Sequence, residues 1–301
     1  MAAGGSHSVL ACYDGNVYAC GANDEGQLGV GDLVPRKLPT LVEFPRDEDV
    51  DEGPLYQSIA KHHDRLFTER VVVVAVACGW RHSAAISTNG ACFVWGENSN
   101  GKLGLGRDVP RAERPTRVLG GVLDGVLVLH VACGTEHTLC GGVDHDDSRS
   151  FGLYAWGHRI NGALGVPTTF RTDGATRTEA HDMSDLVPLY EPVLVPGSRG
   201  VPVRQLACGA FHSAFVDGDG CLMTCGLGDS GQLGRDLRRV AADPVDGTPN
   251  RARADARAFT FGPVLLPRRS RLGTARLRCL RVACGGKGHA GNPWQLGAFS
   301  F

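Results

Sequence analysis

Residues 76–104 read VACGWRHSAAISTNGACFVWGENSNGKLG, and related segments occur four times in the chain, this one included. Residues 131–165 and 206–234 carry the same landmarks, and residues 3–29 carry them without the opening strand. The recurring His lies 14, 14, 20 and 14 residues before the Gly of the second block, and that Gly lies 5 residues before the G-x-L-G block in all four units. Fixed spacing of this kind is the mark of a repeat protein, in which neighbouring units bury a common core.

Each unit predicts a small antiparallel sheet. Asp14-Gly15 and Asn89-Gly90 stand between short apolar runs, which is a strong hairpin signal because Gly tolerates positive φ. The G-x-L-G block then supplies one core leucine per unit, such as Leu103. We expect the Gly after each repeated Cys to adopt positive φ, and the repeated His and the following hydroxyl to bond backbone within their own sheet. The positions predicted to be structural are Gly79, His82, Trp95, Gly96, Gly101, Leu103, Gly104, Gly134, His137, Trp156, Gly157, Gly209, His212 and Gly226.

On these motifs the unit resembles the repeat of the regulator of chromosome condensation family, an all-β fold that forms β-propellers of about seven blades. The resemblance implies one propeller domain over residues 1–301, with about four blades present. The units span approximately residues 2–70, 71–125, 126–200 and 201–275, with a partial unit at 276–301. Two arrangements stay open: a ring of four blades, in which residues 277–285 complete the blade begun at Gly4, and an open arc of an incomplete seven-bladed ring.

Composition sets the outer limits of function. Charged residues make up 21% of the chain and the net charge is −1, so no overall affinity for polyanions is indicated. The amino terminus has no secretory pattern and no stretch is long and apolar enough to be a transmembrane segment, which favours an intracellular protein of the cytoplasm, the nucleus or both. The pattern C-x-x-x-H, as in Cys78 and His82, occurs once per unit, so these pairs belong to different blades, whereas a structural zinc needs four ligands in one place. We therefore interpret these cysteines as small buried apolar groups and not as zinc ligands.

The carboxyl-terminal part differs in charge. Residues 235–281 hold twelve Arg and four Asp, with Arg268, Arg269 and Arg271 in the densest run. A basic face for chromatin or another anionic surface is one interpretation of Arg235–Arg281. A solvated loop is the other, and it is favoured because no aromatic residue interleaves with the arginines from 267 to 281.

Residues 79–83, Gly-Trp-Arg-His-Ser, resemble the Gly-Trp-Arg-His-Thr element of the plant ultraviolet-B photoreceptor. That family gathers such tryptophans from successive blades, whereas the positions matching Trp80 here are Gly5, Thr135 and Ala210. Light sensing is therefore not favoured. Trp80 and Arg81 are instead candidate partner contacts, because Trp and Arg are enriched at binding hot spots.

The functional prediction is a non-catalytic scaffold that binds a protein partner and needs no cofactor and no metal. The polar side chains that stand out recur in every unit, whereas catalysis needs one site with unique members. The alternative is a guanine-nucleotide exchange factor for a small GTPase, as in the founding member of the family. The inserted segment 141–151 would then act as a wedge, and its Asp144, Asp146 and Asp147 are candidate contacts.

Overall fold

The structure, a computed structural model, describes residues 1–45, 71–145, 147, 150–167, 187–235, 257–264 and 278–285. These residues form four separate four-stranded antiparallel sheets and no α-helix, which confirms the predicted all-β propeller class. We call the sheets blades 1 to 4 in chain order.

Each blade takes its strands from consecutive chain segments. Blade 1 holds β1 (Ala2–Ala3), β2 (His7–Ala11), β3 (Val17–Gly21) and β4 (Arg36–Val42). Blade 2 holds β5 (Val73–Cys78), β6 (His82–Ser87), β7 (Cys92–Glu97) and β8 (Arg111–Arg117). Blade 3 holds β9 (Val126–Cys133), β10 (His137–Asp144), β11 (Phe151–Gly157) and β12 (Leu189–Leu194). Blade 4 holds β13 (Val203–Cys208), β14 (His212–Asp217), β15 (Leu222–Leu227) and β16 (Arg257–Pro263). Two short 3₁₀ turns, η3 (Gly121–Leu123) and η4 (Ile160–Gly162), lie in connections.

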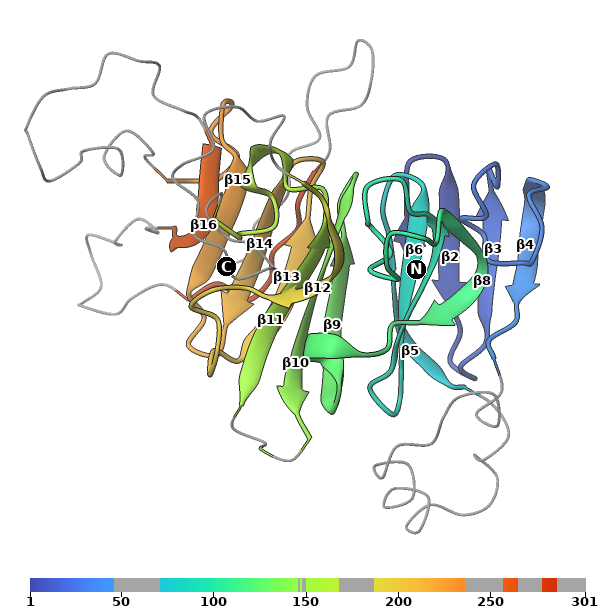
Figure 1. The fold of residues 1–301 in the computed structure, drawn as a ribbon, viewed down its shortest axis with the longest axis horizontal. Coiled ribbons are helices and arrows are strands. Elements are labelled where there is room, and N and C mark those ends of the chain that lie inside the picture. Colours follow the sequence, from blue (N-terminus) through green and yellow to red (C-terminus); the bar gives the residue numbers. More distant parts are fainter. Residues whose placement is uncertain are drawn as a thin grey trace, which may run out of the picture.

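The blades stand side by side in chain order and form an arc, with blades 1 and 4 at opposite ends of the longest axis (Figure 1). Consecutive blades touch through their first and second strands: β2 contacts β5, and β9 contacts both β6 and β13. The ring of four blades is therefore wrong. The inner strand of blade 1 is its own β1, and residues 278–285 lie against blade 4, where the Cys279 N–H donates to the Gly220 carbonyl.

The Gly of the second block has a clear backbone role. Gly21, Gly96, Gly157 and Gly226 have φ between +105° and +113°. Each falls at a register shift in the pairing of the third with the fourth strand of its blade. A Cβ on Gly157 would also lie 2.5 Å from the Glu136 carbonyl oxygen. Only Gly accepts both the left-handed conformation and this close approach.

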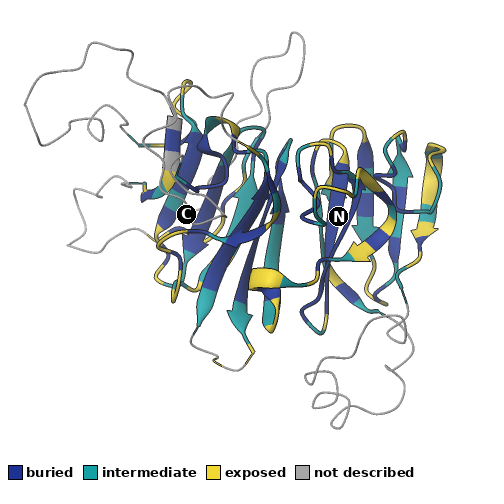
Figure 2. Cartoon of the chain, in the orientation of Figure 1, coloured by how far each residue is buried: buried dark blue, intermediate teal, exposed yellow. Residues whose placement is uncertain are grey.

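Apolar side chains fill the space between the blades. The G-x-L-G leucines, Leu28, Leu103, Leu164 and Leu233, are at most 1% exposed, and Trp95 and Trp156 are fully buried. Figure 2 shows the buried residues following the inner strands, with exposed residues at the outer strands and loop tips. Trp95, Trp156 and these leucines therefore belong to the core of the molecule.

The repeated His and hydroxyl side chains bond across blades, not within them as expected. The imidazole Nε2 atoms of His7, His82 and His137 lie 2.8–2.9 Å from the hydroxyls of Ser83, Thr138 and Ser213 in the next blade. Each hydroxyl in turn donates to a carbonyl of the preceding blade, as from Thr138 to Lys102 at 2.8 Å. Since the hydroxyl proton is used there, the imidazole must donate from Nε2.

The Gly after each repeated Cys does not adopt positive φ, so that prediction is wrong. Its role is close packing instead. A Cβ on Gly79 would overlap both the His82 ring and the Gly134 carbonyl of blade 3. A Cβ on Gly134 would overlap the His137 ring.

Candidate functional site

The rim of the arc at which the second strands begin carries Trp80 and Arg81, the predicted contacts of blade 2. Both follow β5 in the loop that leads into β6. Trp80 is 37% exposed, and its ring lies against the backbone of blade 1, because a Cβ on Gly5 would meet the indole Cε3 at 2.6 Å. The neighbouring blade thus supports the indole while more than a third of the side chain stays exposed.

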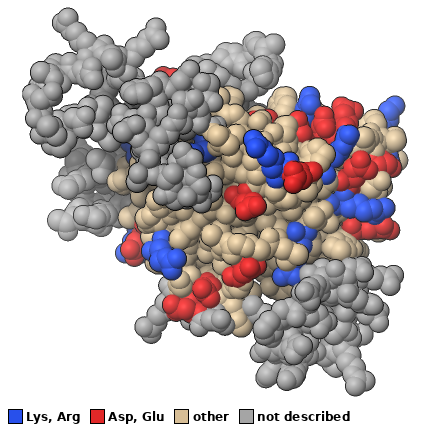
Figure 3. Space-filling model, in the orientation of Figure 1, with Lys and Arg blue, Asp and Glu red and all other residues tan. Residues whose placement is uncertain are grey.

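Arg81 joins a chain of charges over blades 1 and 2. Its Nη1 atom lies 3.5 Å from one carboxylate oxygen of Glu25, and Arg111 Nη1 lies 3.8 Å from the other. Arg111 Nε is also 4.0 Å from Glu113. The Arg81 and Arg111 side chains are 49% and 41% exposed, so these long pairs contribute little to stability. Figure 3 shows acidic and basic side chains interspersed over this half of the molecule.

A tighter ionic cluster connects blades 2 and 3, and the sequence interpretation missed it. Lys102 is fully buried, and its Nζ atom lies 2.8 Å from Glu97 and 2.6 Å from Glu136. Asn100 donates to the same Glu136 carboxylate at 3.1 Å. Burial raises the pKa of Glu97, but the hydrogen bond and charge of Lys102 outweigh it and hold that pKa below its ordinary value.

One sequence signal could have identified this cluster. The residue inside G-x-L-G is Gln27 in the first unit and Gln232 in the fourth, so Lys102 stands out as a charge at a neutral position. The charge of the residue before the repeated His also changes, from positive at Arg81 in the second unit to negative at Glu136 in the third. In both cases it bonds the loop of the preceding blade, Arg81 with Glu25 and Glu136 with Asn100.

The predicted acidic contacts lie at the other rim. Strand β10 begins at His137 and runs to Asp144, so the hairpin tip stands at the end of the strands away from Trp80. The strands take up more of the segment 141–151 than expected, since β10 includes Gly141 and Gly142 and β11 begins at Phe151. Asp144 pairs opposite Val126, and Asp147 is exposed beyond it. Asp146, Arg268, Arg269 and Arg271 lie outside the described residues.

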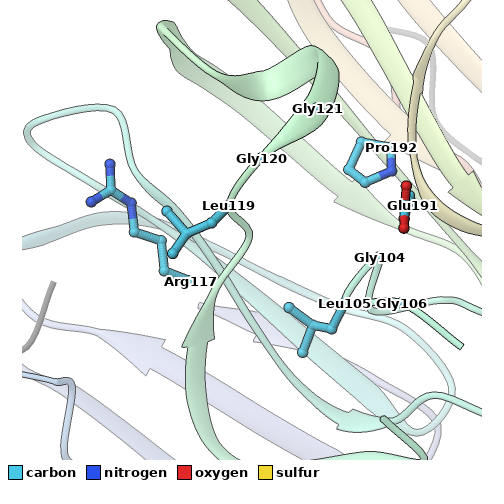
Figure 4. A pocket seen from close by; sticks show the side chains of 9 residues that line it. All are labelled: Gly104, Leu105, Gly106, Arg117, Leu119, Gly120, Gly121, Glu191 and Pro192. Atoms are coloured by element: carbon cyan, nitrogen blue, oxygen red, sulfur yellow. The ribbon is translucent and has the colours of Figure 1, made fainter. Parts of the chain in front are cut away.

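A shallow hollow of about 360 Å³ lies on the outer perimeter between blades 2 and 3 (Figure 4). Leu105, Leu119 and Arg117 line it from blade 2, and Glu191 and Pro192 line it from β12. Among its described lining residues, Arg117 and Glu191 are ionisable. The described lining holds no Ser, Thr, Cys or His side chain, and the Glu191 carboxylate is its one group that could accept a proton as a base.

The cysteines and histidines give no metal centre among the described residues. Burial raises the pKa of the Cys78 and Cys284 thiols to about 12 and keeps them protonated. Burial also lowers the pKa of His7 to about 4 and that of His137 to about 3, so these imidazoles are neutral at pH 7. They are structural groups of the blade junctions. No helix in the described part of the chain is long and apolar enough to cross a membrane.

Comparison with known proteins places these features in context. The family model described as the Regulator of chromosome condensation (RCC1) repeat matches residues 14–51, 89–140 and 152–216, and a second RCC1 repeat model matches residues 73–102 and 203–232.

Curated relatives share the repeat in longer chains. The chain is 30% identical over 243 residues to the human probable E3 ubiquitin-protein ligase HERC6, covering 78% of this chain and 19% of that one. It is 28% identical over 240 residues to human Protein RCC2, covering 76% of this chain and 39% of that one. The chain thus spans between about a fifth and two fifths of the length of these relatives.

The same fold is found in a solved structure. The crystal structure of human WBSCR16 superposes with a TM-score of 0.60 at 22% identity, over 94% of this chain and 55% of that one. Prp20p from Saccharomyces cerevisiae, whose structure is described together with binding to Gsp1p and histones, gives a TM-score of 0.48 at 20% identity, over 95% of this chain and 67% of that one.

Proposed function

Because the chain belongs to the regulator of chromosome condensation repeat family, we propose that it is a non-catalytic propeller module that binds another protein through the rim carrying Trp80. The observation that carries this proposal is the exposed indole of Trp80, held in place by the backbone of the adjacent blade. The few side chains that carry most of the binding energy at protein interfaces are enriched in Trp, Tyr and Arg. Both types stand here on a rigid frame.

The surroundings of Trp80 suit a partner contact. Arg81 and Arg111 share the single Glu25 carboxylate at 3.5 and 3.8 Å and stay half exposed, so either can turn to a partner's carboxylate at small cost. The support for the indole comes from Gly5 of blade 1, while the loop of Trp80 belongs to blade 2. Such preorganisation reduces the entropy lost on binding.

The test is affinity capture with two matched variants, scored by quantitative mass spectrometry. Trp80→Ala should lose most of the captured partner while its melting temperature stays close to that of the unmodified chain. Tyr13→Ala removes a fully exposed aromatic at the hairpin tip between β2 and β3, at the opposite rim, and should capture the partner unchanged. Equal capture by both variants would refute the assignment of the Trp80 rim.

A second candidate is nucleotide exchange on a small GTPase. The hairpin of β10 and β11 favours it, because its strands have 8 and 7 residues against 6 and 6 in blade 2, so its acidic tip reaches further. A factor of this kind stabilises the nucleotide-free GTPase by differential binding. The assay is release of fluorescent GDP from a panel of small GTPases. Loss of release in Asp144→Ala/Asp147→Ala supports the tip as the wedge, and no release from any GTPase by the unmodified chain argues against exchange.

Contact with chromatin or another anionic surface through Arg235–Arg281 is compatible with either candidate, and it remains a prediction from sequence. Most of that segment lies outside the described residues.

A further inference from the structure

The hollow on the outer perimeter between blades 2 and 3 is bordered by residues whose counterparts close the preceding junction. We call it the perimeter hollow and define it by Leu105, Leu119, Glu191 and Pro192. The matching place between blades 1 and 2 shows which side chains the fold accepts there.

At the junction of blades 1 and 2, the segment that follows β4 covers the perimeter. The Phe44 ring packs edge-on against Phe93 and Trp95, with ring centroids 5.3 and 5.8 Å apart. Beside it, Arg114 of β8 donates to the Glu43 carboxylate at 3.0 Å. A large apolar side chain and an exposed ion pair thus lie together across this junction.

The strand register identifies the matching residues of blade 2. Thr40 of β4 and Thr116 of β8 hold the same register position in their blades. Three and four residues further on, blade 1 has Glu43-Phe44 and blade 2 has Leu119-Gly120. The segment after β8 therefore supplies neither the carboxylate nor the aromatic side chain at these two positions.

The residue on the facing strand changes as well. Pro115 of β8 and Pro192 of β12 hold the same register position, so Glu191 stands where blade 2 has Arg114. Glu191 is exposed, and its carboxylate forms no ion pair with a residue that the structure describes. Leu119 is 62% exposed. A carboxylate and an apolar side chain thus replace an ion pair.

The fold fixes the walls of the perimeter hollow. The Gly106 N–H donates to the Tyr190 carbonyl at 2.9 Å and joins the loop of Leu105 to β12. The Asp124 carboxylate accepts from the Gly120 N–H at 3.0 Å and holds the turn before η3. Leu123 of η3 is buried in the main core, so the hollow lies above a closed interior. It is a preformed depression of the surface.

The perimeter hollow is open to a side chain from outside. Gly120 and Gly121 border it with φ of +86° and +65°, and a Cβ on either would meet nothing within 4 Å. Its volume is about 360 Å³, and a cavity of about 150 Å³ is already sufficient for benzene. One large apolar side chain therefore fits with room to spare.

The two charged groups of the lining give the site a direction. Figure 4 shows Glu191 and Pro192 on one side and Leu119 on the other, with Arg117 beyond Leu119. A cation at the Arg117 end would be repelled, whereas a cation at the Glu191 end would meet a carboxylate. A bound segment therefore places its basic group beside β12.

We propose that the perimeter hollow binds a segment of a partner protein in which a Lys or Arg stands beside a large apolar side chain. The apolar side chain rests on Leu105 and Leu119, and its burial supplies most of the affinity. The basic group pairs with Glu191. Because this pair is exposed, it selects the partner more than it strengthens binding. The site is separate from the Trp80 rim and does not depend on it.

The test is selection of random peptides displayed on phage, with the whole chain as the immobilised target. Peptides that bind the unmodified chain but not Leu119→Asp should carry Lys or Arg next to an aromatic or large aliphatic residue. Leu38→Asp is the matched control, because it makes the same change at an exposed leucine of the outer strand β4 and should retain these peptides. Both variants should melt at the temperature of the unmodified chain.

Three outcomes would overturn the proposal. No peptide depends on Leu119, which is expected if another part of the chain or a second copy already covers the hollow. The Leu119-dependent peptides carry acidic residues in place of basic ones. Leu38→Asp loses the same peptides as Leu119→Asp.

A charge exchange tests the pairing with Glu191. One selected peptide is synthesised with a fluorescent label and titrated with the chain by fluorescence anisotropy. Glu191→Lys should weaken binding several-fold, and a peptide with Glu in place of its basic residue should bind Glu191→Lys better than it binds the unmodified chain. Equal affinity of the original peptide for both chains would refute the role of Glu191.

Discussion

The junction between blades 2 and 3 and the junction between blades 3 and 4 close the same space with different side chains. In the first, Trp156 of β11 donates to the Lys102 carbonyl at 2.9 Å, and its ring lies over Gly104. In the second, the matching residue is Cys225, whose sulfur lies 3.5 Å from the Ala163 carbonyl. Phe261 of the outer strand occupies the space over Gly165 instead.

The difference shows which parts of the junction are fixed. The imidazole, the hydroxyl, the carbonyl and the positive-φ glycines, +69° at Gly104 and +68° at Gly165, are common to both junctions. The filling group is exchangeable between strands, because Phe261 packs edge-on against Phe215 at 4.9 Å and replaces much of the missing indole. A blade junction thus combines a constant set of hydrogen bonds, which we call its hydrogen-bond frame, with an apolar side chain that differs between junctions, which we call its apolar plug.

The largest expected effect comes from removing Trp156, the single side chain that fills the junction between blades 2 and 3. Trp156→Ala should lower the free energy of unfolding by about 3–5 kcal/mol, because loss of a fully buried indole leaves a cavity and removes one of the two hydrogen bonds to the Lys102 carbonyl. Cys225→Ala is the matched change in the other junction and should cost on the order of 1 kcal/mol, since it removes one sulfur atom and Phe261 remains. Urea denaturation of both variants measures the difference, and equal losses would contradict the comparison.

The sequence predicted the parts of these junctions that depend on repetition, and it missed those that depend on pairing between units. Leu103 recurs as Leu in all four units, so its burial followed from register, whereas Trp95 is matched by Trp156 and by the smaller Cys20 and Cys225. The spacing of His82 and Ser83 is local and does not tell which blade each side chain meets. Phe261 substitutes for a residue of another strand, and Lys102 binds carboxylates 5 and 34 positions away, so neither is visible in an alignment of units.

The ionic cluster of Lys102 is found in one of the two junctions, since the matching residue of blade 3 is Ala163. Lys102→Met should lower the free energy of unfolding by about 1–3 kcal/mol. This is less than the loss for a fully buried pair, because Glu97 and Glu136 are 20% and 24% exposed and stay hydrated. The triple variant Lys102→Met/Glu97→Gln/Glu136→Gln should recover part of the loss. No recovery would mean that packing of the lysine stem, and not charge, sets the cost.

A glycine that contacts both junctions, Gly134, should have an effect of similar size. Gly134→Val should cost on the order of 1–3 kcal/mol, because the new side chain displaces the His137 ring, which bonds Ser213 in blade 4. Gly125→Ala is the control, since a Cβ there meets nothing within 4 Å, although its φ of +72° carries strain of its own. Thermal unfolding compares the two, and a melting temperature equal to that of the unmodified chain would remove the packing role of Gly134.

The pH dependence should be the same for both junctions, because each holds one neutral imidazole. Burial lowers the pKa of His82 well below 6.5, and burial together with the charge of His212 lowers that of His137 to about 3. The unfolded chain therefore binds protons below pH 6.5 that the folded chain does not, so stability is present above pH 6.5 and is lost as pH falls toward 3. Each imidazole contributes a loss of up to about 1.4 kcal/mol per pH unit in that window.

His82→Gln and His137→Gln should each make the fall in unfolding free energy between pH 6.5 and pH 4 shallower by about one proton, at the expense of stability at pH 7.5. If only one of the two buried variants alters the slope, the other imidazole is already charged in the folded chain. The two junctions would then differ in their hydrogen-bond frame as well as in their apolar plug.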